Sequence, residues 1–114
     1  MTENDEHALL ADLDADDWNT ARDAVEVAGH ALRTRAISSR QKAEISARFL
    51  RLASHPKWEI RKAIAHAMLF LQHDNFLATI GSLVDDENAW VQEAARKTLR
   101  RRESLTRADI GGAA

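Results

Sequence analysis

The chain has 114 residues, the length of a single domain, and 45% of them are apolar, which is enough to bury a modest core. It contains no cysteine, so a disulfide framework and a thiolate metal site are excluded, and with 4 glycines, 1 proline and no tyrosine its composition favours an all-α protein. The acidic start lacks the basic and apolar regions of a signal peptide, and no apolar run has the length of a membrane span, so we expect a cytoplasmic protein.

Apolar residues at helical spacing predict six helices. The third begins after Ser38, whose spacing to Gln41 fits a capping box. Pro56 ends the third helix and starts the fourth, because proline disfavours helical geometry in the residue before it and is tolerated in a first turn. The predicted helices span about 6–13, 17–33, 39–54, 57–72, 75–84 and 89–102.

The connections between these helices are short, so consecutive helices are expected to lie antiparallel and to pair into three hairpins. Together the hairpins make one domain over residues 1–103. The residues that follow, 104–114, end in two glycines and two alanines and are expected to form a flexible tail or a linker. The hairpins span about 6–33, 39–72 and 75–102.

A helical phrase occurs twice, from Trp58 to Met68 and from Trp90 to Leu99, with an offset of 31 residues between equivalent positions. The first hairpin matches more weakly, with an offset of 39. Self-similarity of this kind is typical of stacked helical hairpins. Alanines at the repeated positions let the second helices approach closely. We expect Gly29 and Gly81 to serve the same end, because glycine inside a helix costs about 1 kcal/mol against alanine.

The phrase and the turn before it resemble HEAT-like repeats, especially the short bacterial kind related to phycobilin lyase repeats. The resemblance is carried by residues 55–63 and 85–94 and covers residues 39–102. It implies a right-handed α-α superhelix, a solenoid of about three hairpins that binds proteins, or sometimes nucleic acid, along a concave surface lined by the second helices. Similar repeats often lie beside bacterial signalling or regulatory domains, so the chain is expected to be a free-standing adaptor or the N-terminal module of a larger protein.

The resemblance also gives one arginine a structural role. In the family the arginine after the β-branched residue binds acidic turn residues, which implies that Arg61 pairs with Asp85 or Asp86. The last copy has Gln92 at the equivalent position, so the pattern relaxes at the end of the stack.

Charge alternates along the chain. Residues 1–30 carry nine acids and one base, residues 31–62 nine bases and two acids, residues 63–95 five acids and no base, and residues 96–114 six bases and two acids. The basic middle is either a solvated face or a patch that attracts phosphates or an acidic protein. Arg40 and Lys42 lie at the positive end of the third helix, where a base is unfavourable, so they are candidates for binding a partner.

Trp58 and Trp90 lie near the starts of two second helices. Each is either an interface anchor, since tryptophan is enriched in binding hot spots, or a group that seals its own hairpin. The candidate partner-binding residues are Trp58, Trp90, Arg40, Lys42, Lys62 and Lys97.

No enzymatic motif is found. The five histidines lack metal-binding spacing, and there is no phosphate-binding loop or serine nucleophile elbow, so we expect no metal, no cofactor and no catalytic residue. The predicted function is protein–protein interaction as an adaptor or regulatory module. The alternative is nucleic-acid binding through the basic middle hairpin. The protein is expected to be a monomer or to self-associate weakly, with the acidic first hairpin of one copy against the basic end of another.

Overall fold

The computed structural model describes residues 1–34 and 37–113, with side chains up to residue 108. These residues form helices joined by short loops and contain no strand, which confirms the all-α prediction. None of the described helices has the length and apolar character needed to cross a bilayer. The helices are α1 (Glu3–Leu13), α2 (Trp18–Thr34), α3 (Ser39–Leu52), α4 (Trp58–Ala67), α5 (His73–Leu83) and α6 (Ala89–Ala113).

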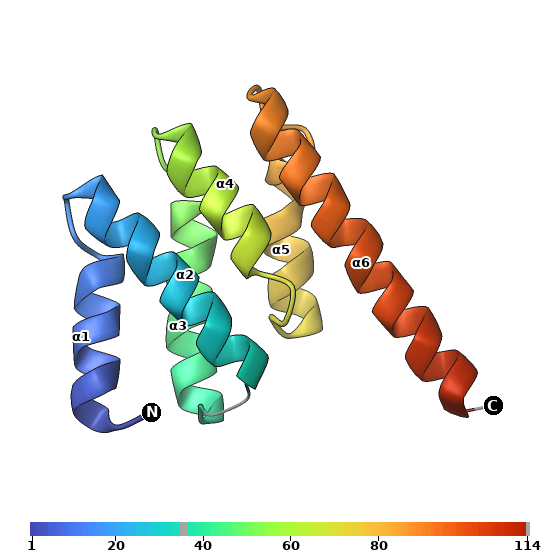
Figure 1. The fold of residues 1–114 in the computed structure, drawn as a ribbon, viewed down its shortest axis with the longest axis horizontal. Coiled ribbons are helices and arrows are strands. Elements are labelled where there is room, and N and C mark those ends of the chain that lie inside the picture. The colour runs from blue at the N-terminus through green and yellow to red at the C-terminus, as the bar shows by residue number, and fades with distance from the viewer. Residues whose placement is uncertain (35–36, 114) are drawn as a thin grey trace.

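The helices form two layers (Figure 1). One layer holds α1, α3 and α5 side by side, and the other holds α2, α4 and α6, with contacts between neighbours in each layer and between the two helices of each pair. The molecule is flat, with extents of 45 × 36 × 18 Å. One face of α2, α4 and α6 is therefore left open to solvent.

The helix starts are fixed by local capping. The predicted box is confirmed: Ser38 Oγ accepts a hydrogen bond from the Gln41 backbone N–H at 3.1 Å, and Gln41 Oε1 accepts one from the Ser38 N–H at 2.9 Å. Thr2 and Asp5 form the same box, so α1 begins earlier than predicted. Asn88 caps α6 through its side-chain oxygen, which accepts from two backbone N–H groups of the first turn.

Two helix ends differ from the prediction. The fourth helix was expected to reach residue 72, but α4 ends at Ala67 and Met68 leaves helical geometry with φ −92° and ψ 3°. The sixth helix was expected to end at residue 102, but α6 continues to Ala113, through residues that were expected to form a tail or a linker. Residues 103–110 contain helix formers and no proline, which allows the helix to continue. Ala114 lies outside the described residues.

The core lies between the two layers and runs through all three helix pairs. Ala24 and Ala94, at repeated positions of the second helices, are buried as the spacing predicted, and Ala63 is partly buried. The largest fully buried side chains are Phe49, Phe76, Leu13, Ile45, Ile60, Ile64, Met68, Leu71, Leu83, Val25, Val91 and Thr79.

The two helical glycines are expected to respond oppositely to alanine. A Cβ on Gly29 would lie 2.8 Å from Ala67 Cβ and 3.1 Å from Ala67 Cα, so Gly29→Ala should lower the free energy of unfolding by about 1–2 kcal/mol as α2 and α4 are pushed apart. The prediction of close packing is wrong for Gly81, where a Cβ meets no atom within 4 Å. Gly81→Ala should therefore raise the free energy of unfolding by about 0.5–1 kcal/mol.

Urea unfolding of the wild type and the two variants measures both changes. Similar shifts of the same sign would contradict the close approach of α2 and α4 at Gly29.

Candidate functional site

The tryptophans in the first turns of α4 and α6 lie against each other. The ring centroids of Trp58 and Trp90 are 5.1 Å apart with an interplanar angle of 40°. Trp58 is partly buried and packs against the core, whereas Trp90 is 60% exposed. The one-position displacement of Trp90 in the repeat therefore places its ring on the outside of the Trp58 ring.

A third tryptophan, Trp18, occupies the corresponding place at the start of α2. It packs partly against the core and carries two cations near its ring, the guanidinium of Arg22 at 5.2 Å and the ammonium of Lys57 at 5.1 Å from the centroid. Lys57 precedes α4, so the Trp18 ring links the first two hairpins. Each of the three second helices thus carries a tryptophan at its first or second position.

A hollow of about 210 Å³ lies between α4 and α6 next to Trp90. Three of the candidate partner-binding residues, Trp90, Lys62 and Lys97, meet here, and Trp58 stands behind Trp90. We call this the upper hollow. It is lined by Lys62, His66, Trp90, Glu93, Ala94 and Lys97.

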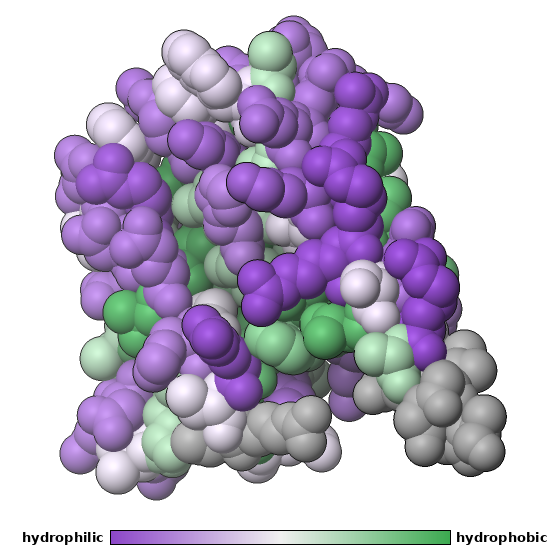
Figure 2. All heavy atoms as spheres, turned by 45° about the vertical axis from the view of Figure 1, so that its right-hand side comes forward, coloured by the Kyte–Doolittle hydropathy of each residue, from purple (hydrophilic) through white to green (hydrophobic). Residues whose placement is uncertain are grey.

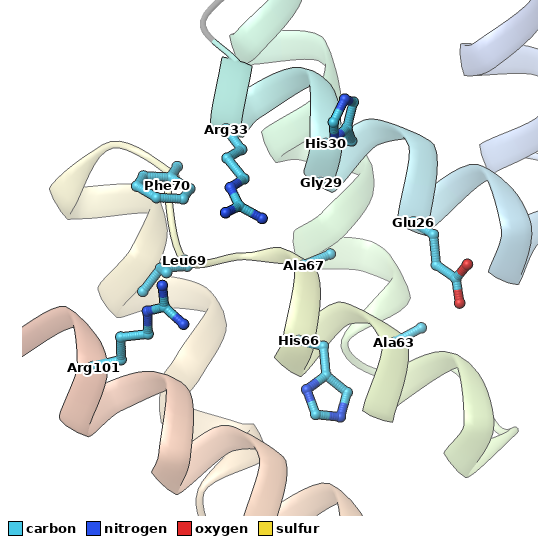
Figure 3. A pocket seen from close by; sticks show the side chains of 10 residues that line it. All are labelled: Glu26, Gly29, His30, Arg33, Ala63, His66, Ala67, Leu69, Phe70 and Arg101. Carbon is cyan, nitrogen blue, oxygen red and sulfur yellow. The ribbon is translucent and has the colours of Figure 1, made fainter.

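A second hollow of about 370 Å³ adjoins the first and shares His66 with it (Figure 3). Arg33 from α2 and Arg101 from α6 reach into it from opposite sides, and Leu69 and Phe70 from the segment after α4 lie between them. We call this the lower hollow, and the two together the second-layer groove. The lower hollow is lined by Glu26, Gly29, His30, Arg33, Ala63, His66, Ala67, Leu69, Phe70 and Arg101.

The charges of the second-layer groove are predominantly positive. Burial, and then the nearby charges of Lys62 and Lys97, lower the pKa of His66, so its imidazole is neutral at neutral pH. The lasting charges are four cations, Arg33, Lys62, Lys97 and Arg101, and two carboxylates, Glu26 and Glu93. Apolar side chains show between polar ones on this side of the molecule (Figure 2).

Arg40 and Lys42 do not belong to the groove, because both lie on α3 in the other layer. Arg40 donates from Nη1 and Nη2 to the two carboxylate oxygens of Glu6, at 2.7 and 2.8 Å. Glu6 is 4% exposed, and the bond from Arg40 lowers its pKa. An acid on α1 therefore accounts for the position of Arg40 at the positive end of its helix.

Two more bases of the middle hairpin are paired with the first hairpin. Asp14, at the end of α1, accepts from Arg48 Nε at 3.3 Å and also binds Arg51. Arg48 binds Glu44 on its own helix at 2.7 Å as well. Arg35 lies outside the described residues. Because these bases already have acidic partners within the molecule, the middle hairpin is a weaker candidate for binding the phosphates of a nucleic acid.

Arg61 joins the loops that precede α4 and α6. Its Nε and Nη2 donate to Asp86 at 2.8 and 3.1 Å, and its Nη1 donates to the carbonyls of His55 and Pro56 at 2.8 and 3.1 Å. Of the two acids considered for this pair, Asp86 makes the contact and Asp85 is exposed. Hydrogen bonding from Arg61 is the main cause of the lowered pKa of Asp86.

Arg102 makes a comparable link at the other end of the second layer, which the sequence analysis missed. Its Nη1 donates to the carbonyls of Leu69 and Leu71, both at 2.6 Å, and its guanidinium carbon lies 4.6 Å from the Phe76 ring centroid. Burial lowers the pKa of Arg102. One turn earlier, Thr98 donates to the Ala65 carbonyl at 2.7 Å, so α6 is tied to α4 along its inner side.

Among the described residues, no three histidine, aspartate or glutamate side chains are grouped so that they could hold a metal ion. The second-layer groove combines aromatic, apolar and cationic side chains. Comparisons of the chain with protein-family models, with curated proteins and with solved structures find no match.

Proposed function

We propose that this chain is a HEAT-like solenoid, a right-handed α-α superhelix of three hairpins, and that it works in the cytoplasm as an adaptor or regulatory module that binds another protein. The order of the helices supports this, since first helices neighbour first helices and second helices neighbour second helices. In such an arrangement the open face of the second helices is the surface presented to a partner.

The observation that carries the proposal is the setting of Trp90. Its side chain is 60% exposed, its ring lies tilted against the ring of Trp58, and it shares the upper hollow with the cations of Lys62 and Lys97. A large ring held in place before binding loses little conformational entropy when a partner covers it. Exposed, preorganised tryptophan beside cationic side chains is the composition of an interface hot spot.

The second candidate, nucleic-acid binding, is favoured by the excess of cations in the second-layer groove. The middle hairpin is a weaker candidate for this function, because Arg40, Arg48 and Arg51 already bind carboxylates of the first hairpin.

Trp90→Ala is the variant that tests the proposal. Partners retained by the immobilised wild type should bind the variant about 30-fold more weakly, because truncating a hot-spot tryptophan costs about 2 kcal/mol or more. Leu50→Ala is the matched control: Leu50 is 49% exposed but lies on α3, in the other layer, and its removal should leave binding unchanged.

Both variants should keep the helical circular dichroism of the wild type, because neither side chain is part of the core. The proposed site is wrong if Trp90→Ala binds the same partners with the wild-type affinity. Nucleic acid is the better reading if single- or double-stranded DNA or RNA binds instead and the affinity falls steeply as salt rises.

A further inference from the structure

Two guanidinium groups, which form no ion pair with any described side chain, reach into the lower hollow from different helices. Arg33 lies in the last turn of α2, and Arg101 lies on α6. Figure 3 shows both side chains extending into the space between the helices. Among the described side chains, neither has a carboxylate within salt-bridge distance. Arg40, Arg48, Arg51 and Arg61 each have one.

The floor between these two cations is apolar. Leu69 and Phe70 follow the end of α4 at Ala67, and Phe70 is 37% exposed. Gly29 brings α2 against Ala67, and Leu69 and Phe70 line the hollow beyond this contact. A ligand in this place would meet an apolar surface flanked by two planar, charged donors.

This combination selects a carboxylate joined to an apolar group. Guanidinium groups bind carboxylates through two parallel hydrogen bonds, and the pair of cations favours one negative charge between them. An aliphatic or aromatic side chain that covers Leu69 and Phe70 removes apolar surface from water, which favours binding. A run of phosphates fits less well, because Glu26 and Glu93 line the same groove on either side of His66.

We propose that the lower hollow binds a segment of a partner protein in which an acidic residue adjoins an apolar one. The carboxylate lies between Arg33 and Arg101, and the apolar side chain covers Leu69 and Phe70. The proposal rests on the protein-binding function proposed above, and it gives that function a partner chemistry. Because the two hollows share His66, an extended segment that fills the lower hollow continues toward Trp90.

The probe is an acetylated and amidated peptide that carries Glu-Leu pairs between glycine and serine residues. In nuclear magnetic resonance titrations it should shift the backbone signals of residues 33, 69, 70 and 101. Arg33→Ala and Arg101→Ala should each weaken binding about 10-fold, the effect of losing hydrogen bonds to a charged group. Arg100→Ala, an exposed neighbour that does not line the hollow, should bind within about two-fold of the wild type.

Two altered peptides separate the parts of the ligand. Replacing Glu by Gln should remove the binding that depends on Arg33 and Arg101, and replacing Leu by Ala should remove the shifts at residues 69 and 70. Equal binding of the Gln peptide would overturn the proposal. So would saturable binding of inorganic phosphate or of an oligonucleotide at these residues that is tighter than binding of the Glu-Leu peptide.

The same set of variants distinguishes this proposal from the function on which it rests. If Trp90→Ala weakens a partner while Arg33→Ala and Arg101→Ala do not, the lower hollow is not the acidic site and the protein-binding function stands. If substitution of Trp90 and of the two arginines leaves the affinity for every partner unchanged, the protein-binding function itself fails.

Discussion

Replacing Arg61 with methionine should lower the free energy of unfolding by about 3 kcal/mol, because the change leaves a buried carboxylate without its cation. The side chain of Asp86 is 8% exposed and receives two hydrogen bonds from Arg61. The carbonyls of His55 and Pro56 lose a donor as well. Methionine keeps the length and apolar stem of the side chain, so the loss reports the charge and its hydrogen bonds. Urea unfolding followed by circular dichroism measures it.

A second substitution and the pH provide controls for this result. Adding Asp86→Asn to Arg61→Met removes the stranded charge and should recover part of the loss. The pKa of Asp86 is lowered in the folded protein, so the pair stabilises the fold above the ordinary value of 3.8, and this contribution is lost as pH falls through the lowered pKa. The difference in stability between the wild type and Arg61→Met should therefore shrink as the pH falls below 3.8 and through the lowered pKa of Asp86. A difference that stays constant in acid would contradict a charge-based role.

Replacing Arg102 with methionine should lower the free energy of unfolding by about 2 kcal/mol, because the carbonyls of Leu69 and Leu71 lose the charged donor that they share. The Phe76 ring also loses its cation. The segment after α4 should then open more readily than the rest of the molecule. Amide hydrogen exchange at residues 68–72 measures this local opening, and urea unfolding measures the global loss.

Arg100→Met is the matched control for this variant. Arg100 lies on the same helix but is exposed, so its replacement should change the free energy of unfolding by no more than about 0.5 kcal/mol. Equal losses for Arg100→Met and Arg102→Met would show that the effect comes from the helix and not from the link to the α4–α5 segment.

The helical spacing of apolar residues predicts the helices well but not all of their ends. The apolar pattern of α4 continues through Met68 and Leu71, and periodicity alone therefore extends the helix. In the folded chain the carbonyls of Leu69 and Leu71 turn to Arg102, more than thirty residues away. A residue on another helix thus competes with local hydrogen bonding, and no local pattern contains that information.

The candidate site could also be predicted only in part, because it depends on contacts between residues of different helices. Lys62 and Lys97 come from the repeated second helices, and stacking those helices is enough to bring the two cations near Trp90. The ion pair of Arg40 could not be predicted from its own helix, because its partner Glu6 lies 34 residues earlier on α1. The lower hollow depends on where α4 ends, so the local sequence around Arg33 and Arg101 does not reveal it.

The ion pairs between hairpins have a consequence for how the chain assembles. Stacked units of similar shape can in principle pack in the wrong order or exchange places with those of another molecule. Here the middle unit meets acids on both sides, Glu6 and Asp14 from the unit before it and Asp86 from the unit after it. A second middle unit in either neighbouring place would lack these three carboxylates. The charges therefore favour the native order of the three hairpins over other orders.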